Sequence, residues 1–219
     1  MSITENLNQI KSEIPDYVDL VAVSKTKPAG DIQEAYDAGQ RLFGENKARE
    51  TEDKYDELPK DIAWHFIGHL QRNKVKYIAP FVELIHSLDS PRLAKEINKR
   101  AKNEERSIKC LLQLHISGEE TKFGFDREEA LEFLSSEKFS NMKNIEIAGA
   151  MGMALHTDDA TILRKQFTEL RKFYEELKSE FPAAKHLSMG MTNDYQVAID
   201  EGSNMIRLGS SIFGERHYD

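Results

Sequence analysis

The feature that most constrains the fold of this sequence is a regular alternation of short apolar segments with longer segments of helical periodicity. Eight short apolar segments occur along the chain, and each is followed by a helix or by a segment long enough to form one. Alternation of this kind predicts parallel strands joined by right-handed crossovers. Eight such units in 219 residues favour a closed (β/α)8 TIM barrel over an open doubly wound sheet, which often has fewer strands.

The apolar segments and the helical periodicities also predict where the elements lie. An additional helix over residues 2–14 precedes the first strand. Because no Pro/Gly/Ser-rich linker interrupts the alternation, we expect one α/β domain over residues 1–219. The expected strands are 19–24, 41–44, 62–67, 81–86, 108–114, 145–151, 185–188 and 205–208. The expected helices after them are 31–38, 46–58, 71–78, 90–102, 127–136, 157–181 and 194–201.

Composition narrows the classes of partner. The formal net charge of -8 argues against binding along a nucleic-acid backbone, and no apolar run is long enough to cross a bilayer. The first residues are polar where a secretory signal would be apolar. Cys110 is the single cysteine, so a reducing compartment fits. We therefore expect a cytoplasmic monomer that binds neither nucleic acid nor membranes.

The end of the first expected strand carries a candidate reactive amine. Alternation places Lys25 on the same face as Val21 and Val23, and Pro28 indicates that strand pairing stops nearby. Burial lowers the pKa of an amine, and a neutral amine can attack an aldehyde to form a Schiff base. The alternative is a lysine at a strand end whose ammonium reaches water.

Two segments suit phosphate binding. In (β/α)8 barrels the loops after the seventh and eighth strands often hold phosphate, and here these loops are residues 188–194 and 209–214. Gly209 permits close approach of a ligand to the backbone, and the hydroxyls of Ser210 and Ser211 can donate to phosphate oxygens. The alternative is ordinary turn chemistry, since glycine and serine are common in turns.

The motifs taken together resemble one known family. The sequence is similar to the pyridoxal phosphate homeostasis proteins, relatives of the barrel domain of alanine racemase. The resemblance implies that this chain binds pyridoxal 5′-phosphate (PLP) and that Lys25 forms the internal aldimine with it. The matching segments are 21–27 (VAVSKTK), 43–46 (FGEN), 64–71 (WHFIGHLQ), 86–89 (HSLD), 116–124 (ISGEETKFG), 149–153 (GAMGM), 187–195 (LSMGMTNDY) and 206–216 (IRLGSSIFGER).

The resemblance also implies the remaining cofactor-binding residues. Ser188, Gly209 and Ser210 would hold the phosphate, and Asn46 would lie near the ring. The chain departs from the family pattern mildly: His115 stands where asparagine is expected, and Ser210 stands where threonine is frequent. Position 210 keeps a hydroxyl, so the phosphate assignment is unaffected.

Arg207, by the same resemblance, would face the pyridine nitrogen. An arginine stays charged and cannot accept a proton, so it leaves that nitrogen unprotonated. The ring then withdraws electrons less strongly, and PLP is held but poorly activated for carbanion chemistry. The alternative is a surface arginine or one in a salt bridge.

The remaining histidines, lysines and the cysteine give weaker indications of a functional site. His65 and His69 do not share a helical face, which argues against a metal pair, and Cys110 lies within an apolar strand and is expected in the core. Lys122, in the loop after the fifth strand, either contacts the cofactor or a partner, or is solvated. Lys27 is the other lysine near the expected site.

Two functions remain open. One is a PLP carrier that holds the cofactor through Lys25 and passes it to apo forms of PLP-dependent enzymes, with no catalytic residue of its own. The other is a PLP-dependent amino-acid racemase. Alanine racemase has a second domain that brings a tyrosine opposite the lysine, and this chain ends at Asp219, so we expect the carrier. A Schiff-base aldolase shares Lys25 and a phosphate site but leaves the other motifs unexplained.

Overall fold

The computed structural model describes residues 2–118 and 123–215, and their strands close into a parallel barrel. Neighbouring strands follow the order of the sequence from β1 to β8, and β8 pairs with β1 to close the sheet. The predicted (β/α)8 barrel is confirmed. The strands are β1 (Asp19–Val23), β2 (Leu42–Glu45), β3 (Ala63–Phe66), β4 (Leu84–Leu88), β5 (Ile108–Leu114), β6 (Ile145–Gly152), β7 (His186–Ser188) and β8 (Met205–Leu208).

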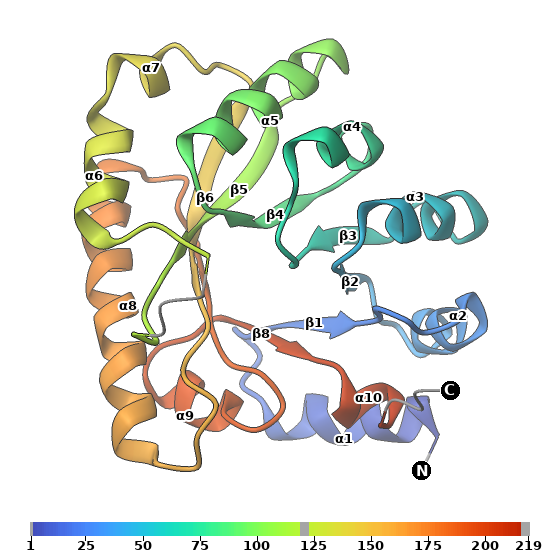
Figure 1. Ribbon diagram of the computed structural model, residues 1–219. Helices are drawn as coiled ribbons and strands as arrows, with labels where there is room; N and C mark the ends of the chain where they lie inside the picture. Colours follow the sequence, from blue (N-terminus) through green and yellow to red (C-terminus); the bar gives the residue numbers. More distant parts are fainter. Residues whose placement is uncertain (1, 119–122, 216–219) are drawn as a thin grey trace.

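The helices lie outside the barrel (Figure 1). One 3₁₀ turn, η1 (Arg72–Lys74), leads into α4, and the short α7 extends the connection after α6. The α-helices are α1 (Ile3–Glu13), α2 (Ala29–Asp37), α3 (Ala48–Glu57), α4 (Val75–Ile78), α5 (Pro91–Asn103), α6 (Arg127–Ser135), α7 (Glu137–Ser140), α8 (Ala160–Glu180), α9 (Tyr195–Asp200) and α10 (Ser210–Phe213).

Local sequence signals fix several helix boundaries. Ser2 and Glu5 form a capping box at the start of α1, in which each side chain accepts a hydrogen bond from the backbone N–H of the other. Ser90 caps α5, and Pro91 occupies its first turn, where no N–H is needed. These signals agree with the close match of the expected and observed boundaries of α1 and α5, which differ by only one residue at each end.

The extra N-terminal helix packs against the last helix of the chain. The amide of Asn6 in α1 donates a hydrogen bond of 2.9 Å to the carbonyl oxygen of Ile212 in α10, and the two helices lie side by side in Figure 1. Since α10 directly follows β8, α1 supports the loop in which phosphate binding was predicted.

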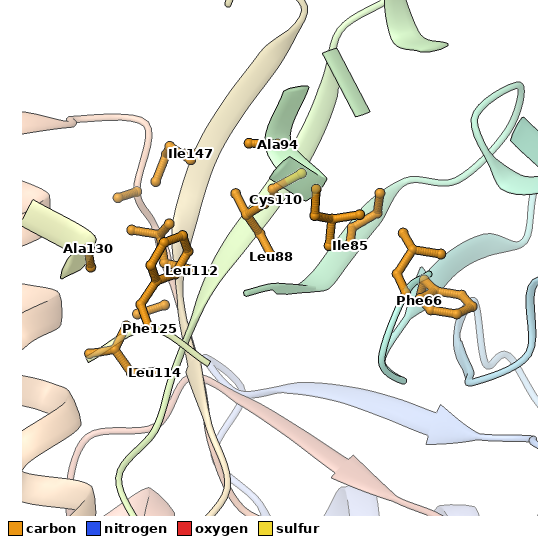
Figure 2. Packing of buried hydrophobic residues seen from close by; sticks show 14 of the residues in the cluster. Phe66, Ile85, Leu88, Ala94, Cys110, Leu112, Leu114, Phe125, Ala130 and Ile147 are labelled. Carbon is orange, nitrogen blue, oxygen red and sulfur yellow. The ribbon is translucent and has the colours of Figure 1, made fainter. Parts of the chain in front are cut away.

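Apolar side chains form a layer between strands and helices and a smaller cluster inside the barrel. Figure 2 shows part of the outer layer, where Cys110 of β5 packs with Ile85 and Leu88 of β4 and with Ala94 of α5. Cys110 is fully buried, and this burial raises the pKa of its thiol, so it is a core residue as predicted. The cluster inside the barrel consists of Val21, Leu84, Leu111, Ala148, Met151 and Met205.

None of the helices in the described part of the chain has the length and apolar composition needed to cross a lipid bilayer.

Candidate functional site

A cavity of about 640 Å³ opens at the carboxyl ends of the barrel strands. Strands of a parallel barrel end at one face, so the loops after them supply its walls. Five of the six predicted cofactor-binding residues line it together: Lys25, Asn46, Arg207, Gly209 and Ser210. Residues that sequence analysis did not assign also contribute, among them His69, Gln113, Phe123, His156, Thr192 and Asp194.

Lys25 lies just beyond the end of β1. Val21 points into the barrel interior, whereas Val23 and Lys25 line the cavity above it, as the alternation predicted. The Lys25 side chain is half-buried. A primary amine therefore lies in the wall of a concave site.

Lys27 also lines the cavity, but its ammonium group is held by backbone oxygens. Its Nζ atom donates hydrogen bonds to the carbonyls of Phe213 at 2.8 Å and Gly214 at 3.4 Å. These contacts fix the carboxyl end of α10 against the loop after β1. They make Lys27 a structural tether and a poor candidate for the reactive amine.

Arg207 forms the floor of the cavity and is almost fully buried. Its Nη1 atom donates to the carbonyl oxygen and to the hydroxyl of Ser188, at 3.0 and 2.5 Å, and Nη2 donates to the carbonyl of Gly152 at 3.2 Å. Burial lowers the pKa of Arg207 to about 10, and the nearby Asp194 carboxylate opposes that shift. The guanidinium therefore stays charged at neutral pH.

Ser188 does not line the cavity. Its side chain is fully buried beneath Arg207, and its hydroxyl lies 3.1 Å from Nδ1 of His86. This position does not favour the predicted role of Ser188 as a phosphate ligand. In this structure Ser188 accepts hydrogen bonds from Arg207, and its role toward phosphate stays a prediction.

A buried polar chain extends from Ser188 across the barrel. His86 Nε2 lies 3.0 Å from Nδ1 of His65, and both rings are buried. Burial lowers the pKa of His65 to about 3 and places that of His86 well below its ordinary value, so both imidazoles are neutral. Sequence analysis missed this chain, although its members were visible as polar residues within apolar strands.

His69 lies at the cavity mouth, where its Nδ1 is 2.9 Å from the Asp89 carboxylate and its ring stacks on Phe123 with centroids 3.7 Å apart. Within the described residues, no three His, Cys, Asp or Glu side chains are arranged to hold a metal ion.

The loops after β7 and β8 meet at the side of the cavity. The Ser210 and Ser211 hydroxyls lie 3.3 and 3.2 Å from that of Thr192. Gly190 has a φ of +98°, and a Cβ there would lie 2.7 Å from the Ala198 Cβ, so only glycine allows this loop to pack on α9. Three hydroxyls are thus gathered at the position where phosphate was predicted.

The cavity has the chemical groups that a phosphorylated aldehyde with a ring nitrogen requires. Lys25 supplies an amine, Arg207 a fixed cation, and Thr192 and Ser210 hydroxyl donors. The Oδ1 atom of Asn46 is buried at the edge of the cavity with no hydrogen-bond partner in the described part of the chain, which leaves it available to a ligand.

His115 and Lys122 were also singled out in the sequence. His115 is half-buried, and its Nε2 atom has no hydrogen-bond partner among the described residues. Lys122 and the neighbouring Glu119 and Glu120 lie outside the described residues.

Comparison with known proteins gives consistent matches over the whole chain. Residues 1–217 match the alanine racemase N-terminal domain family. The pyridoxal phosphate homeostasis protein of Aquifex aeolicus is 41% identical over 201 residues, covering 91% of this chain and 87% of that protein. The one from Pasteurella multocida is 36% identical over 233 residues, covering 100% and 99%. PipY of Synechococcus elongatus, solved with PLP bound, superimposes with a TM-score of 0.88 at 36% identity, covering 97% of this chain and all of PipY.

Proposed function

We propose that this chain, which belongs to the pyridoxal phosphate homeostasis protein family within the alanine racemase N-terminal domain fold, binds PLP reversibly and delivers it to apo-enzymes without turning over amino acids. The observation that carries the proposal is the meeting of Lys25, Arg207 and the hydroxyls of Thr192 and Ser210 in one cavity. PipY, a relative of nearly equal extent, has been solved with PLP bound.

Each group has a distinct role in holding the cofactor. PLP supplies an aldehyde, and the amine of Lys25 condenses with it to a Schiff base that water or another amine can reverse. The hydroxyls of Ser210 and Thr192 and the backbone at Gly209 bind the phosphate dianion. Arg207, held by Ser188 and Gly152, donates a hydrogen bond toward the ring nitrogen.

The charge of Arg207 bears on how strongly the bound ring withdraws electrons. A guanidinium with a pKa of about 10 does not accept a proton at neutral pH, so it leaves the ring nitrogen unprotonated. PLP whose nitrogen is unprotonated stabilises a carbanion weakly, so proton abstraction from a bound amino acid is slow. The free, buried Cys110 fits the reducing cytoplasm in which we place this role.

Transfer of PLP to an apo-enzyme tests the proposal. The protein is loaded with PLP, freed of excess cofactor and mixed with an apo PLP-dependent aminotransferase whose recovered activity is followed over time. We expect a reducible yellow chromophore in the loaded protein and recovery of aminotransferase activity. A protein that acquires no chromophore, or that keeps its PLP while the apo-enzyme stays inactive, would contradict the carrier role.

The competing function is an amino-acid racemase, which the alanine racemase domain family suggests. It differs in a measurable property, the exchange of the amino-acid α-proton.

A further inference from the structure

A buried group of three charged residues lies directly beneath the loop that carries Lys25. The Nζ atom of Lys54 in α3 lies 2.8 Å from Glu45 Oε1 in β2 and 2.8 Å from Glu50 Oε1 in α3. The Lys54 and Glu45 side chains are 9% and 0% exposed, and that of Glu50 is 24% exposed. We call these three residues the Lys54 cluster. None of them lines the cavity, so the cluster does not contact a bound ligand directly.

The Lys54 cluster holds the residue before Lys25. Lys54 Nζ donates a hydrogen bond of 2.9 Å to the carbonyl oxygen of Ser24, and the Ser24 hydroxyl donates one of 2.6 Å to Glu45 Oε1. Ser24 is fully buried, and its backbone N–H also donates to the carbonyl of Gly44 in β2. Both the backbone and the side chain of Ser24 are therefore fixed.

The cluster also holds the residue after Lys25. The backbone N–H of Thr26 donates a hydrogen bond of 2.7 Å to Glu50 Oε1, the same oxygen that accepts from Lys54. Thr26 has a φ of +67°, a left-handed conformation that β-branched residues rarely adopt and that persists only where the surroundings hold it. The chain is thus clamped on both sides of Lys25 by groups that share one ammonium.

Stability alone is a weak explanation for such a cluster. The free-energy cost of desolvating a lysine and a glutamate offsets much of their electrostatic attraction. Apolar side chains of similar volume at such positions often give equal stability. Glu45 Oε2 is buried with no hydrogen-bond partner in the described part of the chain, and burial raises the pKa of Glu45. What the cluster provides in addition is a fixed path for the backbone at residues 24–26.

We propose that Lys54, through Glu45 and Glu50, is a positioning residue that fixes Lys25 for its condensation with the aldehyde of PLP. This inference rests on the proposed function. In the condensation the lone pair of the neutral amine bonds to the aldehyde carbon, a C=N bond replaces the C=O bond, and the aldehyde oxygen leaves as water with the two hydrogens of the amine. The step requires the Lys25 nitrogen to approach the aldehyde carbon from one direction. Loss of the Lys54 cluster should therefore slow formation of the covalent bond and leave the binding of the ring and phosphate unchanged.

Two ligands separate these effects. PLP forms the covalent bond, whereas pyridoxine 5′-phosphate has the same ring and phosphate but an alcohol in place of the aldehyde. The variant Lys54→Met keeps the length of the side chain and removes all three hydrogen bonds of Nζ. We expect it to weaken PLP binding about tenfold or more and to slow the appearance of the yellow chromophore, with the affinity for pyridoxine 5′-phosphate changed less than about twofold.

Matched variants complete the test. Lys54→Arg keeps a charged donor and should recover part of the PLP affinity, and Lys95→Met, at an exposed position of α5, should behave as wild type. If Lys54→Met does not fold, Glu50→Ala removes the acceptor that Thr26 and Lys54 share, leaves the bonds of Lys54 to Ser24 and Glu45 in place, and should show the same selective loss.

The outcomes distinguish this inference from the proposed function. Unchanged PLP affinity and rate in both Lys54→Met and Glu50→Ala, or equal loss of both ligands in the variants that fold, would overturn the positioning role. A wild-type protein that forms no reducible adduct with PLP would instead overturn the proposed function itself.

Discussion

The Nη1 atom of Arg207 lies 2.5 Å from the hydroxyl oxygen of Ser188, beneath the floor of the cavity. Because a guanidinium only donates, the serine oxygen must accept, and its own hydrogen is left to point at Nδ1 of His86. The hydrogen-bonded chain inside the barrel, formed by His65, His86 and Ser188, therefore ends at Arg207. We therefore expect Ser188 to act at the ring end of the proposed cofactor site and Ser210 at the phosphate end.

Replacing these two serines should have different effects on two ligands. Ser210→Ala removes a donor to the phosphate dianion, a charge-assisted bond of roughly 1.5–3 kcal/mol, so PLP affinity should fall about tenfold or more while that for pyridoxal, which lacks the phosphate, stays the same. Ser188→Ala should lower the affinities for PLP and for pyridoxal by a similar factor. Dissociation constants for PLP and pyridoxal provide the measurement.

A selective loss of PLP binding in Ser188→Ala would restore Ser188 as a phosphate ligand. Equal affinity of the wild-type protein for PLP and pyridoxal would place the cofactor outside the loops after β7 and β8.

Lys25 and Lys27 should differ in reactivity although both line the cavity. Lys25→Ala should abolish the adduct that borohydride traps on the peptide containing residue 25. Lys27→Ala should keep that adduct, because Lys27 is already bonded to the carbonyls of Phe213 and Gly214. Mass spectrometry of the digested, reduced protein identifies the modified lysine. An adduct undiminished in Lys25→Ala would assign the reactive amine elsewhere.

The two buried histidines should make the fold sensitive to acid. His65 has a pKa of about 3 in the folded chain and about 6.5 when unfolded, so between these values only the unfolded state binds the proton. Stability is therefore complete above the unfolded pKa and is lost as the pH falls toward the folded one. Going from about pH 7 to about pH 5 should lower the free energy of unfolding by about 2 kcal/mol through His65, and His86 shifts in the same direction.

Urea unfolding at several pH values, followed by circular dichroism, measures how steeply the free energy of unfolding changes with pH. The matched variant His65→Gln keeps a polar side chain that does not titrate, so it should be less stable at neutral pH and should lose stability less steeply on acidification. An identical slope in the wild type and His65→Gln would show that His65 does not remain neutral in the folded chain.

The fold was largely predictable because the signal that defines a barrel is local. Each strand carries its own apolar run, and the expected ranges of β5 and β8 agree with the structure. The fourth strand was placed too early, at 81–86 instead of Leu84–Leu88. Phe81 and Val82 are apolar because they pack at the turn after α4, where their N–H groups donate to the carbonyl of Ile78. Apolar residues in a buried turn and in a strand look the same in one sequence.

The site was predictable only where its residues follow strand ends. Arg207, Gly209 and Ser210 lie at such positions in the chain, and the structure brings them together. The bond between His65 and His86 and the contacts of Lys54 with Ser24 depend on how separate strands and helices align across the barrel. A single sequence shows that Ser24, His65 and His86 lie within apolar segments. It does not state which of them meet.

The last prediction separates the carrier from the racemase through Arg207. Its guanidinium donates hydrogen bonds to uncharged oxygens of Ser188 and Gly152, and its pKa of about 10 keeps it cationic. If Arg207 faces the ring nitrogen of PLP as proposed, that nitrogen would receive a hydrogen bond but no proton, and an amino acid bound through the cofactor should keep its α-proton. We expect negligible α-deuterium exchange when the PLP-loaded protein is incubated with alanine and other amino acids in D2O, measured by NMR beside an alanine racemase as positive control. Exchange at ordinary enzyme rates, on the order of 1–1,000 per second, would overturn the carrier role. In that event His69 and His156, the imidazoles that line the cavity among the described residues, are the candidate bases, and His69→Gln and His156→Gln would identify which one removes the proton.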